Sequence, residues 1–204
     1  MAHSCVAPST AAAAYEMGVG PDKKQFLNRR AIFVDRDGTL NRAVVVDGKP
    51  YPPSTVDQFE LLPGVTEGLL SLKDAGYLVV VVTNQPDVAT GRQSSEVVEA
   101  MHKELRSKLP IDDIRVCFHT DEDRCQCRKP LPGMLLASAK ELDIDLSNSY
   151  MVGDRWRDIE AGQAAGCRTI FIRNGYAERQ PDYYDLVVDS FAEASLAIIG
   201  HLSQ

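Results

Sequence analysis

Two aspartates that flank a single residue, Asp35 and Asp37, come directly after a short apolar run at residues 32–34. The apolar run predicts a buried strand. Side chains two positions apart in a strand lie on the same face, so both carboxylates can point toward one spot, while Gly38 lets the backbone turn behind them. Like charges so close repel one another unless a cation or a shared proton relieves them. Magnesium, which prefers oxygen ligands and commonly shares a phosphate, is the cation we expect here.

Further polar residues stand where other apolar runs end. Thr83 and Asn84 follow a β-branched run and carry a hydroxyl and an amide that can donate hydrogen bonds to phosphoryl oxygens. Asp154 ends the run at residues 150–153 and can bind magnesium beside Asp35, and Asp158 follows one helical turn later. Each feature alone has a simpler structural explanation as a turn at the end of a strand. Their joint occurrence is what favours a phosphoryl-transfer site.

A cationic pair, Arg128 and Lys129, lies between these segments. Two adjacent cations are most often part of a solvated surface. Near a phosphoryl group, however, they can neutralise the charge that develops in the transition state. The planar guanidinium of Arg128 also suits a bidentate contact with a phosphate.

A second candidate metal site precedes this pair, with ligands in the order Cys-x-His-x5-Cys-x-Cys. Three thiols and an imidazole suit tetrahedral zinc, with Cys117, His119, Cys125 and Cys127 as the ligands. Because no ligand position is left open, we expect the zinc to be structural and to fix the loop beside Arg128. The alternatives are unrelated thiols or a strained disulfide between Cys125 and Cys127.

Apolar runs alternate with helical patterns, which predicts an α/β fold: a three-layer, Rossmann-like, open and mostly parallel sheet. Strands are expected at residues 32–34, 78–83, 114–119, 150–152, 169–172 and 186–188, and helices at 64–76, 94–105, 132–142, 155–166 and 191–202. The polar segment 41–59 is rich in turn residues, should lie over the site, and is too short for a large cap domain. Such folds bind ligands beyond the carboxyl ends of the strands, where every candidate residue stands.

In this order the motifs resemble those of the haloacid dehalogenase-like hydrolases over roughly residues 30–200, beginning with D-x-D-G-T at 35–39. The resemblance implies that Asp35 attacks phosphorus to form an aspartyl-phosphate and that Asp37 protonates the leaving alcohol and then activates water. It implies that Thr83 holds the phosphoryl group and that Lys129 neutralises the nucleophile and the phosphate.

Magnesium would be held by Asp35, Asp154 and the backbone carbonyl of Asp37, and Asp158 would brace the neighbours of Asp154 or hold Lys129. The cysteine loop that runs into C-R-K-P is similar to the subgroup of D,D-heptose 1,7-bisphosphate phosphatases and histidinol-phosphatases. In the former, the arginine before the catalytic lysine contacts the far phosphate of the substrate.

The resemblance therefore implies a phosphatase for a small phosphorylated sugar, most readily a heptose 1,7-bisphosphate, with Asn84 and Arg128 binding the substrate. Three departures weaken the substrate assignment: K-P-Y-P-P at residues 49–53, P-D-V at 86–88, and a short zinc loop. The alternatives are a histidinol-phosphate phosphatase, a phosphomutase, and a non-catalytic zinc-stabilised binding module. The complete set of motifs argues against the binding module, and the small segment after the first strand argues against the mutase.

The composition is that of an ordinary globular protein, with 44% hydrophobic and 25% charged residues among 204. A formal charge of −7 and a pI of about 5.1 disfavour a nucleic-acid partner. No apolar run approaches the roughly 20 residues of a membrane span, and no secretory signal is evident. We expect a cytoplasmic monomer without a membrane partner, in which residues 30–204 form one phosphatase domain after a disordered tail at 1–29.

Overall fold

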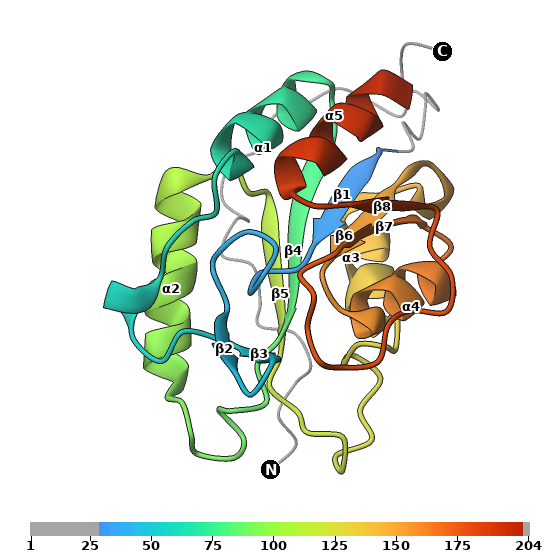
Figure 1. Ribbon diagram of the computed structural model, residues 1–204. Coiled ribbons are helices and arrows are strands. Elements are labelled where there is room, and N and C mark those ends of the chain that lie inside the picture. Colours follow the sequence, from blue (N-terminus) through green and yellow to red (C-terminus); the bar gives the residue numbers. More distant parts are fainter. Residues whose placement is uncertain (1–28, 202–204) are drawn as a thin grey trace, which may run out of the picture.

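The computed structural model describes residues 29–201, and its centre is a six-stranded parallel sheet (Figure 1). The strand order is β5-β4-β1-β6-β7-β8, so the order reverses at β1, which has later strands on both sides. The prediction of an open parallel sheet is confirmed. The strands are β1 (Ala31–Val34), β4 (Leu78–Asn84), β5 (Asp113–Cys117), β6 (Tyr150–Gly153), β7 (Arg168–Ile172) and β8 (Leu186–Val188).

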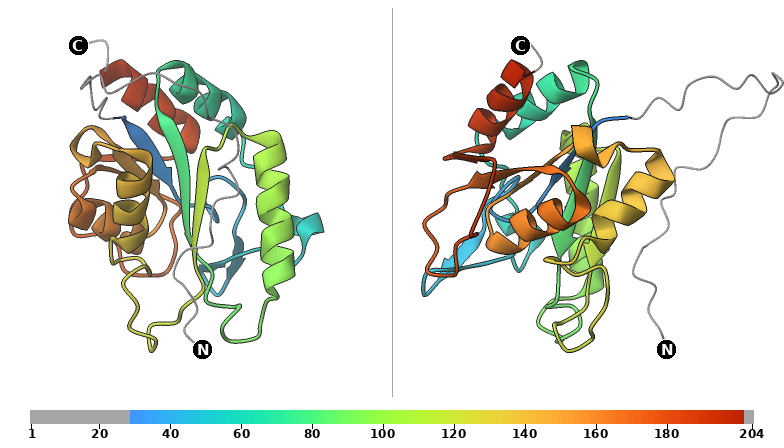
Figure 2. Two further views of the ribbon diagram at one scale, coloured as in Figure 1. Left: turned by 180° about the vertical axis from the view of Figure 1, so that it is seen from behind. Right: turned by 90° about the vertical axis from the view of Figure 1, so that its right-hand side faces the viewer.

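Helices cover both faces of the sheet, which gives the three predicted layers (Figure 2). Alternate residues of β1 enter the two cores: Ile32 and Val34 face one set of helices, while Phe33 faces the other. The first set is α1 (Val65–Asp74), α2 (Ser95–Lys108) and α5 (Phe191–His201), and the second is α3 (Gly133–Leu142) and α4 (Trp156–Ala165). Two short 3-10 helices, η1 (Val56–Gln58) and η2 (Leu146–Asn148), complete the helices of the described residues. Within residues 29–201, no helix combines the length and apolar character of a bilayer span.

The segment between β1 and α1 forms a hairpin of β2 (Val44–Val46) and β3 (Lys49–Tyr51). Asp47 and Gly48 make its two-residue turn with φ values of 50° and 74°. An Asp-Gly pair with two positive φ angles is a preferred hairpin turn, so this local signal was available in the sequence. The hairpin lies toward the carboxyl edge of the six-stranded sheet (Figure 1), and residues 50–52 border one pocket together with Asp35 and Thr83. This agrees with the expectation that this segment lies over the site.

Most element boundaries differ from the expected ones by a few residues, and two of the differences matter here. The predicted strand 114–119 is wrong at its end, because β5 ends at Cys117, where the pairing with β4 also ends. His119 therefore lies beyond the strand and can turn toward the cysteines. Of the predicted tail, residues 1–28 lie outside the described residues, whereas Arg29 forms an isolated bridge with Ile144.

Close packing of α4 on the sheet generates a prediction about Gly162. A Cβ atom there would lie 2.5 Å from Cβ of Met151 and 2.9 Å from Cγ2 of Thr169. We expect Gly162→Ala to lower the free energy of unfolding by about 1–3 kcal/mol through overpacking, measured by urea denaturation. Gly200→Ala in α5 is the matched control, because nothing lies within 4 Å of its Cβ position. Equal stability changes in the two variants would contradict the packing argument.

Candidate active site

A pocket opens at the carboxyl edge of the sheet, beside the point where the strand order reverses. Residues 50–52 of the hairpin form one wall, and Arg155 and Arg157, at the beginning of α4, form another. The remaining wall residues are candidates predicted from the sequence, and they come from four separate parts of the chain: Asp35, Asp37, Thr83, Asn84, Lys129 and Asp158.

The ammonium of Lys129 lies at the centre of this group and is almost completely buried. Its Nζ donates to Asp35 Oδ1 at 2.7 Å and to the Val82 carbonyl at 2.7 Å, and lies 2.6 Å from Asp158 Oδ1. Burial alone would lower the pKa of Lys129, but the carboxylates of Asp158 and Asp35 raise it above its ordinary value. Lys129 is therefore a permanent cation beside the predicted nucleophile, and Asp158 holds it there.

Carboxylate oxygens of Asp35, Asp154 and Asp158 lie within 4.8 Å of one another. Burial, then the charge of Asp158, raises the pKa of Asp35 to about 6, and burial with the charges of Asp35 and Asp158 raises the pKa of Asp154 as well. Among residues 29–201, Asp154 Oδ1 finds no hydrogen-bond partner although it is buried. A hard divalent cation would satisfy that oxygen and relieve the repulsion, so these residues fit magnesium.

Space for the Asp154 carboxylate depends on Gly38. This glycine has a φ of +91°, and a Cβ atom on it would lie only 1.8 Å from Asp154 Oδ2. Any side chain at position 38 would therefore be strained and would displace a predicted magnesium ligand.

Asp37 is held by three neighbouring side chains. Its Oδ2 accepts hydrogen bonds from Nε and Nη2 of Arg36 at 3.1 and 2.8 Å and from Gln85 Nε2 at 2.7 Å. Its Oδ1 accepts one from Asn41 Nδ2 at 3.0 Å. Gln85 also donates to Thr83 Oγ1 at 2.8 Å, so it links two of the predicted catalytic residues. The sequence did not single out Arg36 or Gln85 as residues that position Asp37, because these contacts depend on the geometry of the loop.

Asn84 makes a different contact from the one predicted. Its amide pairs with the backbone of Lys129: Nδ2 donates to the carbonyl at 3.0 Å and Oδ1 accepts from the N–H at 3.1 Å. Both hydrogen bonds fix the backbone of Lys129, the lysine predicted to be catalytic. Asn84 also lines the pocket, so its predicted contact with substrate stays a prediction.

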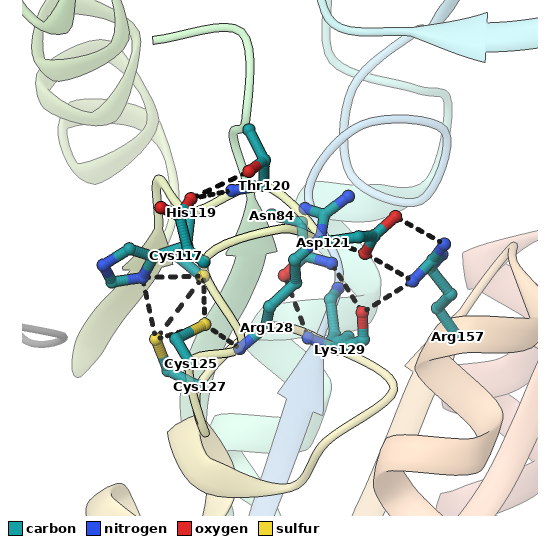
Figure 3. A network of polar contacts seen from close by, with 11 residues as sticks. Asn84, Cys117, His119, Thr120, Asp121, Cys125, Cys127, Arg128, Lys129 and Arg157 are labelled. Carbon is teal, nitrogen blue, oxygen red and sulfur yellow. Dashed lines mark hydrogen bonds and ion pairs between the residues drawn. The ribbon is translucent and has the colours of Figure 1, made fainter. Parts of the chain in front are cut away.

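The predicted zinc ligands form one cluster beside β5 (Figure 3). The three sulfur–sulfur distances are 3.4, 3.5 and 3.7 Å, and His119 Nδ1 lies 3.4 and 3.5 Å from Cys127 and Cys117. These distances are far longer than a disulfide bond of about 2 Å, which excludes the disulfide alternative. They match the edges of a tetrahedron around a metal with bonds of about 2.0–2.3 Å, so the donor set fits zinc. Cys125 Sγ also accepts a hydrogen bond from the Arg128 N–H at 3.4 Å.

Comparison with known proteins places this chain in a family. A model of HAD-hydrolase-like proteins matches residues 126–194. D-glycero-beta-D-manno-heptose-1,7-bisphosphate 7-phosphatase from Pasteurella multocida is 38% identical to this chain in sequence. The alignment covers 84% of this chain and 98% of the length of that protein. The chain belongs to the haloacid dehalogenase-like hydrolases.

Two further members of the haloacid dehalogenase-like hydrolases support this assignment. The protein of the same name from Escherichia coli K12 is also 38% identical, in an alignment that covers 82% of this chain and 93% of the length of that protein. A crystal structure of D,D-heptose 1,7-bisphosphate phosphatase from B. bronchiseptica, complexed with magnesium and phosphate, superposes with a TM-score of 0.73. Its sequence is 30% identical over 84% of this chain and 99% of that one. The fold predicted from the sequence is thus confirmed as that of the haloacid dehalogenase-like hydrolases.

The arginines around the site of this hydrolase are arranged in a way that the sequence did not reveal. Arg128 lines a neighbouring hollow together with Asp121, and its Nε donates to Asp121 Oδ1 at 2.8 Å. Arg155 and Arg157 line the pocket that contains Asp35 and Lys129, and Arg155 is paired through two hydrogen bonds with Glu178. The run G-D-R-W-R-D, with two cations between the predicted site residues, was the available signal.

Behind Asp37 lies a buried histidine of α2. The fully buried Arg36 donates from Nη1 to His102 Nε2 at 3.0 Å. Arginine has only donors, so the histidine must be neutral with its proton on Nδ1. Burial, and next the charge of Arg36, lowers the pKa of His102 to about 3. His102 therefore orients Arg36, which in turn holds Asp37.

This neutral histidine makes stability depend on pH. The pKa of His102 is lowered from 6.5 to about 3 by folding, so below pH 6.5 the unfolded chain takes up a proton that the folded protein does not. The contribution of neutral His102 to the free energy of unfolding is therefore complete above pH 6.5 and declines as the pH falls below it. We expect the stability advantage of wild type over His102→Gln to shrink by about 2 kcal/mol between pH 7 and pH 5 in urea denaturation. An advantage that does not change with pH would contradict a neutral buried His102.

Proposed function

We propose that this chain is a magnesium-dependent phosphatase that hydrolyses D-glycero-D-manno-heptose 1,7-bisphosphate to a monophosphate. The observation that carries the proposal is the contact of Lys129 Nζ with Asp35 Oδ1 at 2.7 Å. It joins two motifs that lie far apart in the chain, at the edge of the sheet where such folds bind ligands. The relatives described above, which match most of this chain, carry the name of this activity.

In the first step, a carboxylate oxygen of Asp35 attacks phosphorus, and the bond between phosphorus and the sugar oxygen breaks. The proton that the leaving oxygen needs comes from Asp37. Oδ2 of Asp37 already accepts three hydrogen bonds, whereas Oδ1 accepts one from Asn41. Oδ1 therefore has the lone pair that can carry the transferable proton.

In the second step, Asp37 takes a proton from water, and the water oxygen attacks the aspartyl-phosphate. The bond between phosphorus and Asp35 breaks, which releases inorganic phosphate and restores the carboxylate of Asp35, while Asp37 is again protonated for the next cycle. Lys129 remains charged throughout and stabilises the negative charge on Asp35 and the phosphoryl group. Thr83 Oγ1, which lies in the pocket wall, donates to a phosphoryl oxygen.

Asp35, Asp154 and the backbone carbonyl of Asp37 would hold magnesium, which supplies charge neutralisation at the transferring phosphoryl group. The unpartnered Oδ1 of Asp154 supports this assignment. Cys117, His119, Cys125 and Cys127 would hold a structural zinc, in line with their mutual distances. Arg128 would contact the far phosphate of the substrate. A cytoplasmic location, a monomeric state and the absence of nucleic-acid and membrane partners stay predictions from the sequence.

A substrate comparison tests the function. We expect kcat/KM for heptose 1,7-bisphosphate, measured with both anomers by phosphate release, to exceed that for histidinol phosphate by at least about tenfold. The physical reason is that guanidinium groups around the pocket attract a second phosphate and repel the ammonium of histidinol phosphate. Faster turnover of histidinol phosphate would overturn the substrate assignment.

The same assay tests the nucleophile. Asp35→Asn should lose at least about a thousandfold in kcat, because its amide cannot attack phosphorus as the carboxylate does, and unchanged turnover would overturn the assignment of Asp35 as the nucleophile.

A metal experiment tests the zinc assignment. We expect a zinc-selective chelator to lower the melting temperature by about 10 °C, equivalent to roughly 3 kcal/mol, and magnesium removal to lower it less. Cys125→Ser should reduce the bound zinc measured by metal analysis. The matched control is Cys167→Ser, since Cys167 is buried outside the cluster. Equal thermal shifts on removal of either metal, or full zinc retention in Cys125→Ser, would contradict a structural zinc site.

A further inference from the structure

Asp121 joins two arginines that come from different elements of the fold (Figure 3). Its Oδ1 accepts from Arg128 Nε at 2.8 Å, and its two oxygens lie 3.2 Å from Nη1 and Nη2 of Arg157. Arg128 follows the cysteine cluster, whereas Arg157 belongs to the first turn of α4. The two guanidinium groups therefore converge on one place that already holds an anionic group.

The charges at this place are not balanced. Arg155 has a carboxylate of its own in Glu178, but among residues 29–201 Arg128 and Arg157 share Asp121 as their ion-pair partner, with Asp123 acting on Arg128 only from a longer range. Asp121 is 64% exposed, so its charge is also partly screened by solvent. Nη1 of Arg128 is buried and has no hydrogen-bond partner among residues 29–201. A second anion at this place would find surplus positive charge and an unused donor.

Arg157 is held in a fixed position beside the catalytic lysine. Its guanidinium lies 4.6 Å from the centre of the Trp156 ring, and its Nη1 lies 3.5 Å from the Lys129 carbonyl. It also lines the catalytic pocket, whereas Arg128 lines the hollow next to it. A group bound by both arginines would thus lie at the border between the pocket and this hollow.

We propose that Arg157 determines specificity by binding, together with Arg128, the phosphate that remains on a bisphosphorylated substrate. The inference rests on the proposed function, because only a bisphosphate keeps a phosphate after hydrolysis. A planar guanidinium suits this task, since it donates two parallel hydrogen bonds to phosphate oxygens. The class of ligand is a second phosphomonoester on the same small sugar.

The test compares a bisphosphate with a substrate that has a single phosphate. We measure kcat/KM for heptose 1,7-bisphosphate and for p-nitrophenyl phosphate, and take their ratio. In Arg157→Gln the ratio should fall by about tenfold or more, chiefly through KM for the bisphosphate, because a charge-assisted contact is lost. Arg179→Gln is the matched control: Arg179 lies 4.6 Å from the same Trp156 ring but pairs with Glu160 and Asp182. Its ratio should stay within about twofold of wild type.

The outcomes separate the two claims. A wild-type enzyme that does not prefer the bisphosphate overturns the proposed function and this inference with it. A wild-type preference that survives Arg157→Gln, or that falls equally in Arg179→Gln, overturns the inference alone. If Arg157→Gln does not fold, Arg157→Lys takes its place, since it keeps the charge but lacks the planar group. Its ratio should fall by about threefold, and an unchanged ratio overturns the inference.

Discussion

The buried ammonium of Lys129 is the interaction on which the rest of the site depends. An ammonium has three N–H donors, and here the oxygens of Asp35, Asp158 and Val82 lie within 2.7 Å of it. If the lysine were removed, two buried carboxylates would lose their compensating charge, at a cost of about 3–5 kcal/mol for such a broken pair. One side chain thus links β1, β4 and α4 at the edge of the sheet. Its position is a condition for stability as much as for chemistry.

The fold meets this condition by fixing the backbone of Lys129 as well as its side chain. The Asn84 amide holds that backbone with two hydrogen bonds from the end of β4. On the preceding residue, the Arg128 N–H donates to Cys125 Sγ in the cysteine cluster. The cluster and the end of β4 therefore restrain Lys129 from two directions. In this respect the cysteine loop belongs to the active site although its side chains form a separate centre.

Much of this arrangement could be predicted from the sequence, because the carboxyl ends of parallel strands meet at one edge. This rule brings Asp35, Thr83 and Asp154 together without knowledge of any loop. Contacts that depend on loop geometry could not be predicted in the same way. The bond between His102 and Arg36 is an example, since periodicity places a histidine on the buried face of α2 but does not say what it meets. The Asn84 amide is a second example. It was expected to face the substrate, but it is hydrogen-bonded to the backbone of Lys129, which only the folded loop before α3 brings near.

Gly38 shows how a residue without a side chain can shape a predicted metal site. It offers no ligand atom, yet the space that its missing Cβ leaves is the space that the Asp154 carboxylate occupies. Replacement by alanine, ordinarily a mild change, would act here as a ligand mutation. A saturation screen of the chain should therefore find position 38 as intolerant as the aspartates themselves, and a survey confined to polar residues would overlook it.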